Sequence, residues 1–185
     1  MLQLVGLSAL YMSSKYEDTK YISMKDMLYL CLDQYTSKEI NYVEHKILVT
    51  FEYKLLYTST IHTFAILFDI LDNYDQIFAT CIKYLCDIST LYSMFLQHSS
   101  SKITASIFAI VRSFKNFENI FPKNISYFSD YKLSDIEDCV QTFFMFFSHE
   151  NHTKNYVYKK YSETKYMNVS HEFEKFEWNK IISIN

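Results

Sequence analysis

The chain contains a single glycine, Gly6, and a single proline, Pro122, among 185 residues. Strand-rich folds depend on tight turns, and glycine supplies most of the positive-φ positions that such turns need. Long helices joined by short polar loops need few of either residue. The sequence therefore predicts an all-α fold. The abundance of Tyr, Phe, Ile, Asn and Lys also fits an A/T-rich genome, which weakens this argument without reversing it.

The clearest helical signal is the segment Leu2–Glu17, which is apolar nearly all round. A helix of this kind normally forms the buried centre of an all-α domain. Three small residues within it, Gly6, Ser8 and Ala9, allow neighbouring helices to approach closely. We therefore expect other helices to surround this one.

A capping box marks the start of a second helix. In Thr36-x-x-Glu39, each side chain is placed to satisfy a free backbone N–H at the helix start. The predicted helix runs from Ser37 to about Tyr53 and carries one apolar stripe at helical spacing. The same periodicity predicts further helices near residues 61–72, 76–94, 102–114, 120–130, 134–148 and 152–165.

The pattern also predicts two helical modules. Residues 57–60 interrupt the apolar pattern, and one of their hydroxyl side chains is expected to cap the next helix. A second apolar helix with small residues, Lys102–Val111, and a second capping box, Ser134-x-x-Glu137, follow the first pair at a nearly constant offset. Such spacing is typical of a duplicated module.

Composition and charge disfavour several function classes. With 18 basic and 21 acidic residues, the net charge is −3, so nucleic acid is not expected as the main partner. The sequence has no Gly-rich phosphate loop, no G-x-S-x-G motif and no spaced histidine set, so we expect no enzyme activity, no cofactor and no metal site. The best apolar run, His62–Leu71, is too short to span a membrane and contains Asp69.

The cysteines are expected to be small buried residues of a reduced, intracellular protein, since no two of them form a C-x-x-C pair. They are Cys31, Cys81, Cys86 and Cys139.

Four segments, in this order along the chain, carry a family resemblance: Leu2–Glu17, Tyr35–Leu48, Phe95–Ser106 and Lys160–Ser170. They resemble the third and fifth helices of one cyclin box, then the start of the third helix and the closing Lys-Tyr…Val-Ser segment of a second. The chain thus resembles mitotic cyclins of the A/B type, with the B type favoured. The resemblance implies a fold of tandem cyclin-box helical domains, of which the first is incomplete.

The implied domains are a partial N-terminal cyclin box at 1–56 made of helices three to five, a linker at 57–60 and a C-terminal cyclin box at 61–178. The first two helices of box one are not matched, nor is the Met-Arg-x-x-Leu docking motif that they carry. A truncated gene or a genuinely short form would each explain this. We therefore expect Leu4, Leu7 and Tyr11 to lack partners and box one to expose apolar surface.

Glu44 is unusual because it falls inside the apolar stripe of its predicted helix. A carboxylate there must pair, lie at an interface or reach solvent past its neighbours. Lys15 near the end of its helix complements the helix dipole and needs no partner for that. The resemblance implies a different role, in which Lys15 and Glu44 together grip the regulatory helix of a kinase.

The resemblance also assigns apolar positions to this contact. The residues implied to receive the kinase helix are Met12, Tyr16, Leu48 and Leu55; without the resemblance, all four would be interpreted as core residues. Leu2 and Gln3 match the edge of a substrate-docking patch.

The implied function is regulatory: such a protein binds and activates a cyclin-dependent serine/threonine protein kinase in mitotic control, and resides in the nucleus and cytoplasm. The kinase holds the ATP and performs the phosphoryl transfer. Two alternatives stay open. One is a transcription-associated cyclin-box protein, either a transcriptional cyclin or a factor like TFIIB, whose basic DNA face the acidic balance disfavours. The other is a cyclin fragment that activates nothing.

Overall fold

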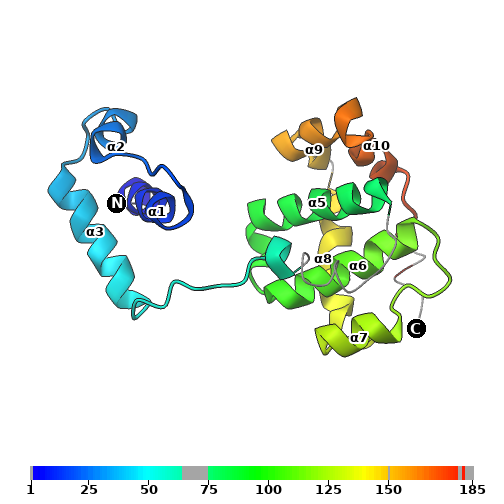
Figure 1. The fold of residues 1–185 in the computed structure, drawn as a ribbon. Coiled ribbons are helices and arrows are strands. Elements are labelled where there is room, and N and C mark those ends of the chain that lie inside the picture. The colour runs from blue at the N-terminus through cyan, green and yellow to red at the C-terminus, as the bar shows by residue number, and fades with distance from the viewer. Residues whose placement is uncertain (1, 64–74, 150, 179–180, 182–185) are drawn as a thin grey trace. The chain divides into compact units, whose positions relative to one another are not determined.

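The computed structural model describes residues 2–63, 75–149, 151–178 and 181. Within these residues every regular element is a helix, which confirms the all-α prediction. The chain divides into two compact units, Met1–Tyr57 and Thr58–Asn185 (Figure 1).

The first unit consists of three helices, α1 (Leu2–Glu17), α2 (Met24–Leu30) and α3 (Ser37–Thr50). The capping box of α3 is present as predicted: Glu39 N–H donates to Thr36 Oγ1 at 3.3 Å, and Thr36 N–H donates to Glu39 Oε2 at 2.8 Å. The Thr36 N–H and the Thr36 hydroxyl both donate to the Glu39 carboxylate, and these two hydrogen bonds lower the pKa of Glu39. The helix ends three residues before the predicted Tyr53, because Glu52 and Tyr53 adopt positive φ.

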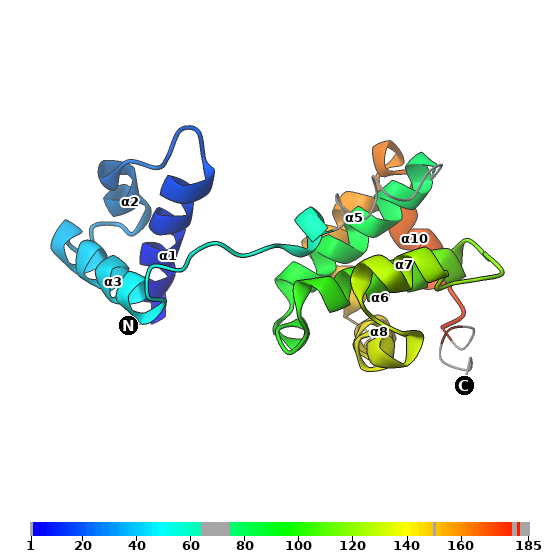
Figure 2. The same cartoon turned by 60° about the horizontal axis from the view of Figure 1, so that its bottom comes forward.

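The prediction that Leu2–Glu17 forms a buried centre is wrong. Only two of its residues, Ser8 and Ser14, are buried. The reason is that α2 and α3 both lie on one side of α1, so among the described residues of this unit its other side has no covering helix (Figure 2). Leu4 and Leu7, which were expected to lack partners, are half-buried.

The small residues of α1 divide into two kinds. Ser8 lies fully buried at the contact with α3, where its Oγ donates to the backbone oxygen of Ile40 at 3.2 Å. Gly6 does not mark a close approach, because a Cβ added there would meet no atom within 4 Å. The predicted close packing is thus correct at Ser8 and wrong at Gly6.

The second unit packs around α6 (Ser100–Phe114), whose residues Ile103–Val111 are all buried. Together with the neighbouring helices α5 (Gln76–Leu91) and α8 (Leu133–Ser148), α6 supplies most of the core (Figure 1). The remaining elements are α7 (Lys123–Ser129), α9 (Tyr156–Tyr161), α10 (Val169–Glu174) and the short 3₁₀ helices η1 (Ser93–Phe95), η2 (His152–Lys154) and η3 (Thr164–Tyr166). The predicted second apolar helix is therefore the centre of this unit.

Two predicted helices differ from the structure. Residues 60–63 begin a helix capped by Ser59, whose backbone oxygen accepts from Thr63 N–H at 3.0 Å, while the rest of the predicted 61–72 helix lies outside the described residues. The predicted 152–165 helix is divided into η2, α9 and η3, because the Asn155 side chain accepts from Tyr158 N–H and starts a new helix there. Helix α10 was not predicted.

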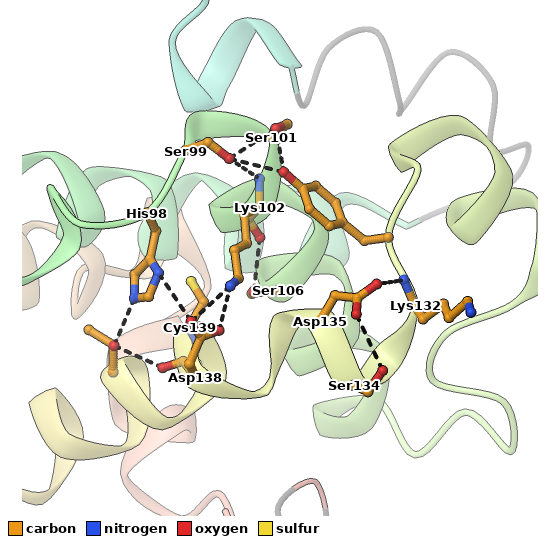
Figure 3. Close-up of polar contacts among 12 residues, drawn as sticks. His98, Ser99, Ser101, Lys102, Ser106, Lys132, Ser134, Asp135, Asp138 and Cys139 are labelled. Atoms are coloured by element: carbon orange, nitrogen blue, oxygen red, sulfur yellow. Dashed lines mark hydrogen bonds and ion pairs between the residues drawn. The ribbon is translucent and has the colours of Figure 1, made fainter.

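The second capping box is also wrong. Helix α8 begins at Leu133, so Ser134 lies inside its first turn and does not cap it. The carboxylate of Asp135 accepts from Lys132 N–H at 2.8 Å and from Ser134 Oγ at 3.4 Å (Figure 3). Asp135 therefore performs the role predicted for Glu137. The predicted second capping box, Ser134-x-x-Glu137, is absent, so only the first of the two boxes taken as a sign of duplication forms as predicted.

Candidate functional site

Lys15 and Glu44 meet where the end of α1 crosses the middle of α3. Lys15 Nζ donates to Glu44 Oε1, so the carboxylate inside the apolar stripe is paired. The Lys15 side chain remains 35% exposed and that of Glu44 14%. A partly exposed ion pair of this kind contributes only ~0.2–1 kcal/mol to stability. Its charged atoms lie at the surface, within reach of a partner.

The last turn of α1 is fixed by the buried residue Ser14. Its Oγ donates to Asp18 Oδ2 at 2.8 Å and accepts from Ile22 N–H at 2.9 Å. Asp18 N–H also donates to the backbone oxygen of Ser14 at 3.0 Å. The loop after α1 therefore folds back on the turn that carries Lys15.

An apolar groove of about 320 Å³ lies beside this turn, between the ends of α1 and α3; we call it the terminal groove. It is lined by Met12, Ser13, Tyr16, Glu17, Phe51, Lys54, Leu55 and Tyr57. Three of the four apolar residues predicted to receive a kinase helix thus line one groove. The fourth, Leu48, is half-buried on α3 and is not among the lining residues.

Phe51 and Tyr57 are exposed lining residues of the terminal groove to which the sequence assigned no binding role. Phe51 lies on the same helical stripe as Leu48 and Leu55, and this spacing was the signal that could have identified it. Tyr57 was placed in the linker, and no local pattern marks it as part of a groove.

The structure does not bring Leu2 and Gln3 to the terminal groove. Both lie in the first turn of α1, at the opposite end from Lys15. Leu2 is 88% exposed, and Gln3 Oε1 accepts from the Tyr35 hydroxyl at 3.2 Å.

A larger groove of about 820 Å³ lies between the start of α1 and α3. Its apolar lining includes Leu4 and Val5 from α1 and Tyr42, Val43 and Ile47 from α3. Of the three residues that were expected to form exposed apolar surface, Leu4, Leu7 and Tyr11, only Leu4 lines this groove.

Polar side chains of the second unit form a network between the start of α6 and α8 (Figure 3). His98, whose side chain is 5% exposed, lies with Nε2 3.0 Å from Thr142 Oγ1 and Nδ1 3.8 Å from Asp138 Oδ2. Lys102 Nζ donates to Asp138. Burial lowers the pKa of His98, while the Asp138 carboxylate opposes that shift. The network thus joins the start of α6 to α8.

The cysteines lie where the sequence predicts them, in buried positions. Burial raises the pKa of Cys81 and Cys86 to about 12 and that of Cys139 to about 11, so these thiols are poor nucleophiles. Across residues 2–63, 75–149, 151–178 and 181, no group of acidic, histidine and cysteine side chains has the arrangement of a metal site. Among the same residues, no helix is both long and apolar enough to cross a bilayer.

Two family models match the chain. The one described as "Cyclin, N-terminal domain" matches residues 1–56, and the one described as "Cyclin, C-terminal domain" matches residues 59–174.

Similar curated proteins include "G2/mitotic-specific cyclin-B" of Emericella nidulans, 28% identical over 91% of this chain and 35% of the relative. "G2/mitotic-specific cyclin-A" of Patella vulgata is 25% identical over 91% of this chain and 40% of the relative. "Cyclin-A1" of Homo sapiens is 27% identical over 91% of this chain and 36% of the relative. The chain therefore spans well under half the length of these relatives.

Proposed function

The chain belongs to the cyclin family, and we propose that it is a regulatory subunit that binds and activates a cyclin-dependent serine/threonine protein kinase in mitotic control. The observation that carries this proposal is the Lys15–Glu44 pair at the surface beside the terminal groove. The names of these relatives support the mitotic type over a transcription-associated protein.

The terminal groove supplies the apolar part of the proposed interface. An amphipathic helix binds such a groove by burying one apolar face, and aromatic anchors at its centre contribute most of the affinity. Tyr16 offers an aromatic anchor on α1, and Met12 on α1 and Leu55 after the end of α3 add apolar lining. Leu48 lies one helical turn beyond Glu44 and extends the same face.

The Lys15–Glu44 ion pair is proposed to orient the kinase helix in the terminal groove. Lys15 has further N–H donors beyond the one bonded to Glu44, and the carboxylate has a second oxygen, so both groups have hydrogen-bonding capacity for a partner. Charged groups at the edge of an apolar interface fix register and raise the association rate. In this proposal the kinase's regulatory helix moves inward when it binds, which completes the kinase's own Lys–Glu ion pair before phosphoryl transfer.

We also propose domain bounds, a docking edge and a location for the protein. We propose a partial N-terminal box at 1–56, a linker at 57–60 and a C-terminal box at 61–178, with Leu2 and Gln3 at a substrate-docking edge. The protein would reside in the nucleus and cytoplasm, act as a regulator without enzyme activity of its own, and use neither nucleic acid nor a membrane as its partner.

The test uses the full chain and a purified mitotic cyclin-dependent kinase. Calorimetry measures binding, and phosphorylation of a peptide substrate measures activation. We expect a one-to-one complex and faster phosphorylation than with the kinase alone. Binding without faster phosphorylation would identify a non-activating form, and the absence of binding would refute the proposal.

A further inference from the structure

The ammonium group of Lys15 has a second partner, on its own helix. Its Nζ lies 4.2 Å from the centroid of the Tyr11 ring, while it also donates to Glu44. Tyr11 precedes Lys15 by four residues, the spacing at which side chains on one helix face meet. The ring of Tyr11 is half-buried. A cation at this distance from an aromatic ring is attracted by the negative charge of the ring face.

The contact is closer than the other lysine–tyrosine contacts within single helices of the described chain. Lys46 lies 5.6 Å from the Tyr42 ring, and Lys160 and Lys165 each lie 4.9 Å from the ring of the following tyrosine. Lys15 is thus held from two directions, by a ring on α1 and by a carboxylate on α3. This matters because a lysine carries a point charge on a flexible four-carbon stem, and a single ion pair leaves that stem several conformations.

We propose that Tyr11 is a positioning residue for the kinase-binding face: its ring holds the Lys15 ammonium against Glu44 before the partner arrives. A side chain ordered in advance loses less conformational freedom on binding, so the complex is tighter. The effect on kinase affinity rests on the proposed function. The ordering of Lys15 does not, and it can be measured in the chain alone.

The binding experiment is a double-mutant cycle with the full chain and a purified mitotic cyclin-dependent kinase. Tyr11→Leu removes the ring, Tyr11→Phe keeps it, and Lys15→Met removes the charge while keeping the stem. We expect Tyr11→Leu to weaken binding about two- to fivefold, the size of an exposed cation–π contact, and Tyr11→Phe to bind as the unchanged protein does. In the Lys15→Met background, Tyr11→Leu should change nothing. Equal weakening in both backgrounds would overturn the proposal, because Tyr11 would then act without Lys15.

The second measurement needs no kinase. NMR of the isotopically labelled chain should show the Lys15 ε-methylene protons shifted upfield by the Tyr11 ring in the unchanged protein and in Tyr11→Phe. In Tyr11→Leu, these protons should return to the position of an unrestrained lysine. Unchanged Lys15 signals in Tyr11→Leu would overturn the proposal. If the unchanged protein bound no kinase, the proposed function would fail, and the Lys15 signals alone would decide whether Tyr11 orders this side chain.

Discussion

Lys15 and Glu44 are 29 residues apart in the chain, yet they form an ion pair because the last turn of α1 packs against the middle of α3. The contact connects the two helices that line the terminal groove. Its partly exposed atoms add little to the stability of the unit, as the proposed binding role of the pair requires.

Tyr16→Ala should weaken kinase binding by roughly 2 kcal/mol, or about thirtyfold, because an exposed aromatic residue that lines an apolar groove becomes a typical hot spot once a partner buries it. The measurement is the dissociation constant by calorimetry. Tyr29→Ala is the matched control, since Tyr29 is 77% exposed on α2 and does not line the terminal groove. Equal effects of the two variants would show that the groove does not receive the partner.

Ser14→Ala should destabilise the first unit by about 1–3 kcal/mol, because it leaves the Ile22 N–H and the Asp18 carboxylate without their shared partner. Faster hydrogen exchange at the Ile22 amide would report the opening of the loop. Ser13→Ala, on the exposed neighbouring position, is the control. A protected Ile22 amide in Ser14→Ala would contradict the role given to this loop.

The His98 network should make the second unit less stable in mild acid. Burial lowers the pKa of His98 in the folded state, so the unfolded state takes up its proton first as pH falls. This contribution to stability is complete above the ordinary histidine pKa of 6.5 and is lost as pH falls below it towards the lowered folded value. Two charged groups face the His98 ring: Asp138 raises its pKa and Lys102 lowers it.

Urea unfolding at several pH values tests this point. His98→Gln should flatten the dependence of unfolding free energy on pH below 6.5, whereas His62→Gln, at an exposed position, should keep the slope of the unchanged protein. The account of His98 is wrong if both variants give the same slope.

The larger apolar groove should promote self-association of the chain. Val5→Glu puts a charge into this groove and should lower the average mass measured by light scattering at high protein concentration. Leu96→Glu is the control, because Leu96 is exposed in a loop of the second unit and far along the chain from the groove. A monomeric unchanged protein would contradict this prediction.

Features set by neighbouring residues were predicted best from the sequence. The Thr36–Glu39 capping box formed as expected because its hydrogen bonds involve only one helical turn. Ser134 shows where such reasoning fails: two acidic residues, Asp135 and Glu137, compete for the start of α8, and Asp135 binds the Lys132 N–H two residues before the predicted cap. Local patterns do not decide between such competing caps.

Burial depends on what packs against a helix, which its own sequence does not contain. The segments Leu2–Glu17 and Lys102–Val111 look alike as apolar helices with small residues, yet the first is covered on one side and the second lies at the centre of its unit. The same limit applies to the terminal groove. The family resemblance identified Met12, Tyr16 and Leu55. Tyr57 also lines the groove, but it follows the end of α3, where no helical periodicity predicts its position.

The central claim is that Glu44 serves the partner more than the fold, and Glu44→Ala tests it when affinity and thermal midpoint are measured on the same sample. A charge-assisted hydrogen bond contributes about 1.5–3 kcal/mol, so kinase affinity should fall about tenfold or more, while the midpoint stays nearly unchanged. Glu172→Ala, which removes an exposed carboxylate paired with Lys175, should change neither. A sharp fall in the midpoint of Glu44→Ala, with kinase binding at low temperature intact, would show that Glu44 is a structural partner and would contradict the account.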